Sequence, residues 1–138
     1  MIVYLSLGAN LGNREQTIQQ AINRLAAEAG KVLAQSSLFY SEPWGFRSEH
    51  RFCNCCVKLQ TALSPIDLLR LTQRIERSLG REKKSGDDGY SDRTIDIDLI
   101  RALDEQDNEI CVHSPELTLP HPLWTQRDFV RIPLAEIT

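Results

Sequence analysis

Two aspartates within one short apolar segment are the strongest local sign of chemistry in this sequence. In the segment TIDIDLI, Asp96 and Asp98 alternate with Ile95, Ile97 and Leu99, the period-two pattern of a β-strand. The two carboxylates therefore share one face of that strand, about 6–7 Å apart. Aspartate is a poor strand former, and the two charges repel unless a cation neutralises them. Oxygen ligands suit Mg²⁺, so we predict a metal site here, with a solvated sheet face as the alternative.

Basic residues lie on both sides of this segment. Arg81, Lys83, Lys84 and Arg93 precede it, and Arg127 follows further along the chain. Arginine and Mg²⁺ together stabilise the charge that develops on a transferring phosphoryl group. The loop before the strand also carries acidic residues, so a solvated charged loop is the alternative. Neither the P-loop motif nor the Rossmann glycine fingerprint is present, so a nucleotide would be held by some other device.

Polar and aromatic side chains elsewhere are also candidates for ligand binding. Phe52 and Asn54 fall on the same face of an expected strand, and an amide beside an aromatic ring suits a flat heteroaromatic ligand. A structural polar residue near a sheet edge is the alternative for Asn54. His121 stands between prolines in LPHP, where a structural role and a phosphate contact both remain open. Trp44, in a loop with Pro and Gly, is either a flap residue or a packing plug.

The four cysteines carry no metal or disulfide signature. Cys53, Cys55 and Cys56 lie within four residues, and Cys111 stands alone. Their spacing lacks the C-x₂-C pairs of a zinc site, and neighbouring strand residues point to opposite faces. We therefore expect all four to be reduced and to pack as small core residues.

Strands and helices alternate along the chain in an order that limits the fold. Strands are predicted over 2–7, 31–40, 52–61 and 94–101, and Gly8 is interpreted as part of the turn after the first. One helix is expected between an Asn13 cap and a Gly30 stop, and another between a Ser64 cap and Gly80. Loops are expected over 41–51 and 81–93. Beyond the fourth strand we predict a tail with one short apolar piece, 109–112.

Four strands with only two helices require antiparallel neighbours, because parallel neighbours need a crossover connection. The order β-α-β-β-α-β predicts an α+β fold: a ferredoxin-like antiparallel sheet with helices packed on one face, plus a C-terminal extension. Fold alone does not define chemistry.

Composition narrows the class of protein. The chain has 138 residues, 41% hydrophobic and 25% charged, and 16 basic against 19 acidic residues give a net charge of −3. These values predict one ordered domain over residues 1–138, with no membrane span and no general nucleic-acid binding. The N-terminal segment MIVYLSLGANLGN lacks the basic region of a secretory signal, so we expect a cytoplasmic protein.

Taken together, these motifs resemble the 6-hydroxymethyl-7,8-dihydropterin pyrophosphokinase family of folate biosynthesis. The resemblance covers essentially the whole chain. Its most specific parts are RTIDIDLI at 93–100 and the LPHP…RDF run within 117–137; the other matching parts are LSLGANLGN at 5–13, SLFYSEPWG at 37–45, FCNCCVKLQT at 52–61 and LLRLTQRIERSLGR at 68–81.

The resemblance implies an enzyme that transfers the β,γ-pyrophosphoryl group of ATP to the pterin hydroxymethyl oxygen and releases AMP. It implies that Asp96 and Asp98 hold two Mg²⁺ ions. It also implies that the catalytic residues are Arg81, Arg93, Asp96 and Asp98. The residues implied for the pterin are Ser41, Trp44, Phe52, Asn54 and Phe129. Those implied for ATP are Gln73, Glu76, Arg81, Lys83, Tyr90, Arg93, Leu99, Thr118, His121 and Arg127. We expect a monomer whose partners are these two substrates.

Two other classes of protein remain as alternatives. A ferredoxin-like regulatory module would bind a small ligand without turnover, but it gives no reason for the aspartate pair. A metal-dependent phosphodiesterase or nuclease could use the same carboxylates, but the acidic net charge argues against it.

Overall fold

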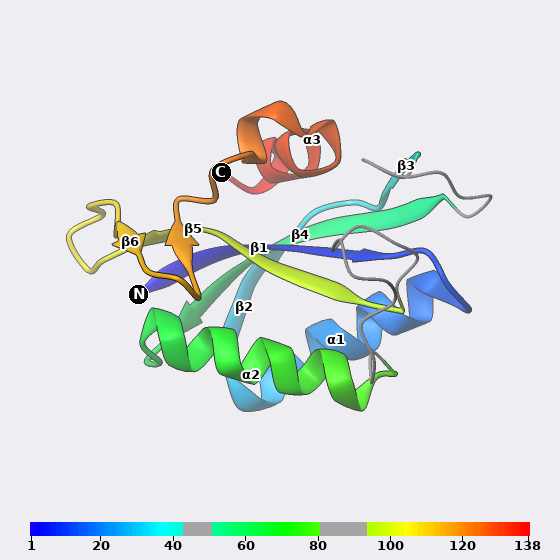
Figure 1. Ribbon diagram of the computed structural model, residues 1–138, viewed down its shortest axis with the longest axis horizontal. Coiled ribbons are helices and arrows are strands. Elements are labelled where there is room, and N and C mark those ends of the chain that lie inside the picture. The colour runs from blue at the N-terminus through cyan, green and yellow to red at the C-terminus, as the bar shows by residue number, and fades with distance from the viewer. Residues whose placement is uncertain (43–50, 81–93) are drawn as a thin grey trace.

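An antiparallel sheet with helices on both faces forms the frame of the molecule (Figure 1). The computed structural model describes residues 1–42, 51–80 and 94–138. In these residues the strands of the main sheet are β1 (Ile2–Ala9), β2 (Gly30–Gln35), β3 (Phe39–Ser41), β4 (Phe52–Thr61) and β5 (Asp96–Leu103). The remaining elements are α1 (Arg14–Glu28), α2 (Pro65–Ser78), the small pair β6 (Val112–His113) and β7 (Thr118–Leu119), a short 3₁₀ turn at Trp124–Gln126, and α3 (Asp128–Ile137).

The strand order is β2-β4-β1-β5, and every pairing between these strands is antiparallel. Strand β3 also pairs antiparallel with β4, at the first residues of β4, which β2 does not reach. Helices α1 and α2 both cover one face of this sheet (Figure 1). This is the α+β ferredoxin-like arrangement that the order of elements predicted. We call the face under α1 and α2 the lower face and the opposite face the upper face.

Both long helices begin at the predicted caps. The Asn13 side chain accepts a hydrogen bond from the Gln16 amide at 3.2 Å, and Ser64 accepts one from the Asp67 amide at 3.2 Å. The second helix ends before Gly80, whose φ of +113° lies in the region that favours glycine. The apolar stripes of α1 and α2 pack against the lower-face residues of β1, β4 and β5 in one continuous core.

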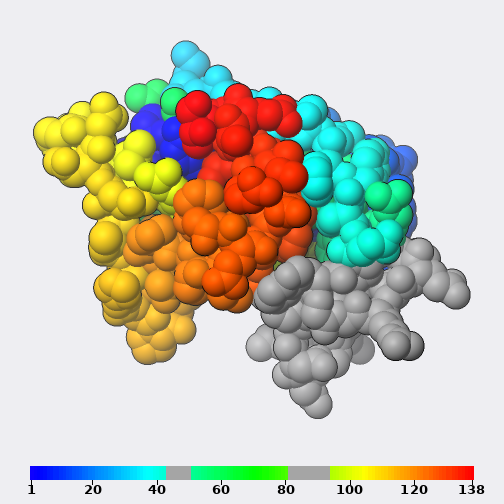
Figure 2. Space-filling view, turned by 90° about the horizontal axis from the view of Figure 1, so that it is seen from above, coloured from blue at the N-terminus to red at the C-terminus, as the bar shows by residue number. Residues whose placement is uncertain are grey.

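The C-terminal segment differs from the predicted tail. Residues 128–137 form α3, which packs on the upper face over β4, β3 and β1. In Figure 2, which views the molecule from above, the red and orange surface of α3 lies beside the cyan surface of the β2–β3 segment. Val130 and Leu134 of this helix join Tyr4, Cys56 and Ile100 in a second, smaller core.

The predicted strand over 31–40 is in fact two strands. Between β2 and β3, the Ser36 hydroxyl accepts a hydrogen bond from the Cys56 amide at 2.9 Å, while the Ser36 amide donates to the Cys56 carbonyl at 2.8 Å. A side chain thus replaces a backbone acceptor, and the ladder is interrupted. The prediction for the cysteines was wrong at one position: Cys53, Cys55 and Cys56 are buried, but Cys111 is exposed.

No helix in the described ranges is both long and apolar enough to cross a membrane.

Candidate active site

A row of four residues crosses the upper face of the sheet from β3 to β5. Phe39 pairs with Asn54, Asn54 with Gly8, and Gly8 with Asp96. Directly paired residues of antiparallel strands point to the same face, and neighbouring strands lie about 4.8 Å apart. The Cα atoms of Asn54 and Asp96 are therefore about 10 Å apart. The candidate ligand-binding amide and the candidate metal-binding carboxylate thus flank a single glycine.

Gly8 leaves the floor between these side chains open. The prediction that Gly8 belongs to the turn after the first strand was wrong, because Gly8 lies within β1. A Cβ atom at this position would be 3.1 Å from Asn54 Oδ1 and 3.5 Å from the ring carbon Cδ1 of Phe52. The absence of a side chain therefore keeps space beside the amide and the aromatic ring. Sequence reasoning missed this residue because its importance depends on its pairing with two distant strands.

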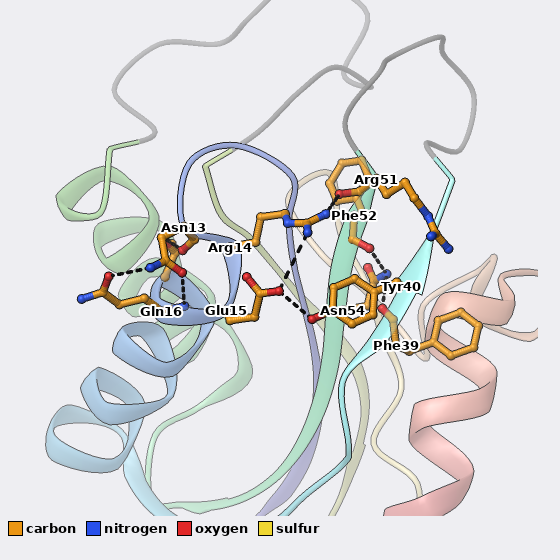
Figure 3. Close-up of polar contacts among 10 residues, drawn as sticks. Asn13, Arg14, Glu15, Gln16, Phe39, Tyr40, Arg51, Phe52 and Asn54 are labelled. Atoms are coloured by element: carbon orange, nitrogen blue, oxygen red, sulfur yellow. Dashed lines mark hydrogen bonds and ion pairs between the residues drawn. The ribbon is translucent and has the colours of Figure 1, made fainter.

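The orientation of the Asn54 amide is determined by its partners on β3. Asn54 is 1% exposed, and its Nδ2 donates to the Phe39 carbonyl at 2.9 Å and to Ser41 Oγ at 2.8 Å (Figure 3). A carbonyl oxygen can only accept, so Nδ2 must face β3 and Oδ1 must face Gly8. The side chain therefore presents a hydrogen-bond acceptor to the open floor.

Asp96 and Asp98 are half-buried on the upper face of β5, as their alternation predicted. Between these two aspartates, the backbone of β5 is held by a hydrogen bond to helix α2. Glu76 of α2, which is 7% exposed, accepts a hydrogen bond from the Ile97 amide at 2.8 Å through Oε2. Helix α2 therefore positions the segment that carries both aspartates.

The donor set at this place suits Mg²⁺. Among the described residues there is no group of three or more His, Cys, Asp or Glu that could hold a metal ion by itself. Mg²⁺ is commonly bound through one or two carboxylates together with substrate phosphates, and it retains several waters. A pair of carboxylates on one strand face matches that requirement.

The segment after β7 brings a histidine and an arginine toward the aspartates. The His121 amide donates to the Ile100 carbonyl of β5 at 2.8 Å, and His121 Nδ1 accepts from the Leu123 amide at 3.2 Å. In the neutral ring the proton is therefore on Nε2. Burial and the positive Arg127 lower the pKa of His121, while Asp96 acts in the opposite direction. His121 is thus within electrostatic reach of both Asp96 and Arg127.

Phe129 of α3 lies next to this group on the upper face. Its ring is half-buried, and the guanidinium carbon of Arg127 is 5.8 Å from the ring centroid. Arg127 itself is only 4% exposed. The upper face therefore combines an amide acceptor, two aromatic rings, two carboxylates, a neutral imidazole and a buried guanidinium, a set suited to a flat polar ring together with a phosphate group.

Comparison with known proteins assigns the family. A model of the 7,8-dihydro-6-hydroxymethylpterin-pyrophosphokinase family matches residues 4–138. The chain belongs to this family. It is 48% identical over 137 residues to the 2-amino-4-hydroxy-6-hydroxymethyldihydropteridine pyrophosphokinase of Porphyromonas gingivalis, covering 99% of this chain and 90% of that protein. The enzyme of the same name from Bacillus subtilis is 36% identical, with 99% and 77% covered.

Two further proteins that this chain resembles are much longer than the chain itself. The folic acid synthesis protein FOL1 of Dictyostelium discoideum is 36% identical over 136 residues, but the chain spans only 19% of its length. A solved structure described as HPPK-DHPS in complex with substrates superposes with a TM-score of 0.69 over 99% of this chain and 40% of that one. At 13% sequence identity, this likeness supports the fold alone.

The structure brings together most of the described residues that the family resemblance assigned to the pterin. Ser41 contacts Asn54 directly, Phe52 borders the space over Gly8, and Phe129 approaches from α3 on the same face. Trp44 lies outside the described residues.

The residues assigned to ATP are more dispersed. His121 lies within electrostatic reach of Asp96 and Arg127, whereas Gln73 is exposed on α2 and Thr118 is half-buried in β7. The Leu99 side chain is buried in the lower core, so only its backbone could reach a ligand on the upper face. Glu76 bonds to the backbone of β5. Arg81, Lys83, Tyr90 and Arg93 lie outside the described residues.

Gly80 at the end of α2 and Thr94 just before β5 lie side by side. A Cβ atom on Gly80 would be 3.4 Å from the Thr94 methyl group. The chain therefore leaves α2 and returns to β5 at nearly the same point, two residues before Asp96.

Proposed function

We propose that residues 1–138 act as one domain and as a monomer that transfers pyrophosphate from ATP to 6-hydroxymethyl-7,8-dihydropterin, giving AMP and the pterin diphosphate. Membership of the pyrophosphokinase family supports the reaction class. One observation supports the assignment to particular residues. In the row Asn54–Gly8–Asp96, the proposed ring-binding amide and a carboxylate lie two strands apart on the same face of the sheet, with Gly8 between them. All candidate residues come from this one chain.

The pterin would lie over Gly8. The Oδ1 atom of Asn54 would accept a hydrogen bond from the N–H edge of the pterin, since Nδ2 is already engaged by β3. Phe52 and Phe129 would provide ring faces for stacking. This arrangement would direct the hydroxymethyl group away from β4 and toward Asp96, because Gly8 lies between the two.

Asp96 and Asp98 would hold two Mg²⁺ ions together with the triphosphate. When bound, these ions would neutralise negative charge on the transferring group. Arg127 would add fixed positive charge, and neutral His121 would donate from Nε2 to a phosphate oxygen. The resemblance adds Arg81 and Arg93 to this charge-stabilising group.

The transfer would be a single in-line displacement. The hydroxymethyl oxygen bonds to the β-phosphorus, the bond from that phosphorus to the α,β-bridging oxygen breaks, and AMP leaves with that oxygen. The hydroxyl proton passes to solvent water. The contribution of this chain is then positioning and charge stabilisation rather than covalent chemistry.

An assay of AMP against ADP tests the proposal. The protein would be mixed with ATP, Mg²⁺ and 6-hydroxymethyl-7,8-dihydropterin, and the nucleotides separated by chromatography. We expect pterin-dependent AMP that disappears when Mg²⁺ is omitted. Asp96→Ala should lower turnover at least about a thousandfold, because it removes half of the carboxylate pair that holds the metal.

Glu105→Gln is the matched control, since it neutralises an exposed acidic residue just beyond the opposite end of β5. It should leave the rate unchanged. Retained activity in Asp96→Ala would refute the two-carboxylate metal site. Tight pterin binding without AMP formation would indicate a binding protein instead of an enzyme.

A further inference from the structure

The first turn of α1 contacts the middle of β3 and the residue that precedes β4, and these two strands carry the candidate ring-binding residues. Strand β3 has only three residues and, among the described strands, pairs with β4 alone. Ser41 and Phe39 bond to Asn54 on the upper face, so Tyr40 between them points to the lower face, toward α1. Figure 3 shows the Tyr40 side chain reaching Glu15 of that helix.

The contacts form a small network, which we call the α1 clamp: Arg14, Glu15, Tyr40 and the Arg51 carbonyl. The Tyr40 hydroxyl donates to Glu15 Oε2 at 2.6 Å, and the Arg14 guanidinium carbon lies 5.3 Å from the centre of the Tyr40 ring. Arg14 Nη1 donates to the Arg51 carbonyl at 2.7 Å, and Nη2 is 3.8 Å from Glu15 Oε2. One helical turn therefore contacts both the middle of β3 and the residue before β4.

The start of α1 is itself defined, which gives the clamp a fixed base. Asn13 caps the helix by accepting from the Gln16 amide, and its Nδ2 donates to Gln16 Oε1 at 3.1 Å. Arg14 and Glu15 are then the first two residues of the helix, and the negative Glu15 is favourable in the first turn.

The α1 clamp bears on the orientation of the Asn54 amide. A small shift of β3 along β4 would move both acceptors, the Phe39 carbonyl and Ser41 Oγ, away from Asn54 Nδ2. The amide could then rotate and present a donor in place of an acceptor. We propose that Arg14 and Glu15 are positioning residues for pterin recognition: through Tyr40 and Arg51 they hold β3 in register, so that Asn54 keeps Oδ1 directed over Gly8. The inference rests on the proposed function, because it concerns how the same site distinguishes its substrate.

The clamp acts on one half of the candidate site only. It contacts strands β3 and β4, whereas Asp96, His121 and Arg127 are held by α2 and by the segment after β7. Loss of the clamp should therefore weaken recognition of the pterin and not of ATP. A purely structural role would affect both substrates alike.

Kinetic analysis of Tyr40→Phe and Glu15→Ala tests this. Each variant should raise the KM for the pterin about fivefold, the effect of losing one hydrogen bond, and leave the KM for ATP and kcat within about twofold. The double variant should be no worse than Glu15→Ala alone, because Glu15→Ala already removes the hydrogen bond that Tyr40→Phe removes.

Glu28→Ala is the matched control. Glu28 is exposed at the other end of the same helix and pairs with Arg24 there, so its loss should change neither KM. An unchanged pterin KM in both clamp variants, or equal increases for both substrates, would overturn the inference. Absence of pterin-dependent AMP from the unaltered protein would instead refute the proposed function, and with it this inference.

A spectroscopic titration tests the clamp independently of catalysis. The hydrogen bond to Glu15 raises the pKa of Tyr40 to about 12. In the unaltered protein, tyrosinate absorbance should therefore include a step near pH 12, and Tyr40→Phe should remove it. Glu15→Ala should move the same step toward pH 10, the ordinary value for tyrosine; a step that stays near pH 12 would contradict the contact.

Discussion

At the scale of single residues, Gly8 has the sharpest consequence for binding. Its neighbours on both sides carry functional groups, and a methyl group would lie 3.1 Å from Asn54 Oδ1. The glycine is needed here for the space above it, because its φ is not in the left-handed region. Gly12 differs: it has a φ of +65° and no atom within 4 Å of its would-be Cβ.

Alanine at these two glycines should give opposite results. Gly8→Ala should raise the KM for the pterin about tenfold or more, because the added methyl group would occupy the space beside Asn54 and Phe52 where we propose that the pterin lies, and it should change stability little. Gly12→Ala should lower the free energy of unfolding by about 1 kcal/mol because of its backbone conformation, with an unchanged pterin KM. Steady-state kinetics and urea denaturation measure both effects. An unaffected KM in Gly8→Ala would exclude ring binding over the floor.

At the scale of elements, Glu76 in the contact between α2 and β5 has two possible roles. The family resemblance places it near ATP, and the structure shows it accepting from the Ile97 amide. Glu76→Gln and Glu76→Ala distinguish these two roles, because glutamine keeps a hydrogen-bond acceptor without the charge. If the anchor matters, alanine should cost about 1–3 kcal/mol of unfolding free energy and raise the KM for ATP, whereas glutamine should do much less. Equal impairment in both variants would show that the charge is what matters.

The elements also show what sequence could and could not predict. Both long helices, their caps and the alternation of Asp96 with Ile97 depend on local patterns, and they were predicted correctly. Helix α3 was missed because Pro133 lies inside it and its apolar residues cover the sheet only through distant contacts. The break between β2 and β3 was missed because it depends on Ser36 bonding to Cys56, twenty residues away. The period-two pattern and then the family motifs pointed to Asn54 and Phe52 as candidates, but the orientation of the amide required the register of β3 against β4.

At the scale of the whole molecule, the sheet separates two cores. The lower core lies beneath α1 and α2, and the upper core is formed mainly by Tyr4, Cys56, Ile100 and α3. Burial raises the pKa of Cys56, at the centre of the upper core, to about 12. The ordinary value for an unfolded cysteine is about 8.5.

This difference predicts alkaline destabilisation of the fold. Between about pH 9 and pH 12 the Cys56 thiol is protonated in the folded chain and ionised in the unfolded chain. The unfolded state then binds fewer protons, so the free energy of unfolding falls as pH rises, by about 1.4 kcal/mol per pH unit for this group. Urea denaturation at several pH values measures the slope, and Cys56→Ala should reduce it by that amount. An identical slope in the variant would show that Cys56 is not the responsible group.

The strand order has a consequence for synthesis of the chain. Asn54, Gly8 and Asp96 are neighbours in space, yet nearly ninety positions along the chain separate Gly8 in β1 from Asp96 in β5. A nascent chain emerging from the ribosome can pair β1 with β4, but β1 keeps an open edge until β5 has been translated. The helix that covers the upper face comes later still. The proposed active site would thus be complete only after β5 and α3 have been translated, and products of synthesis interrupted before α3 would be inert.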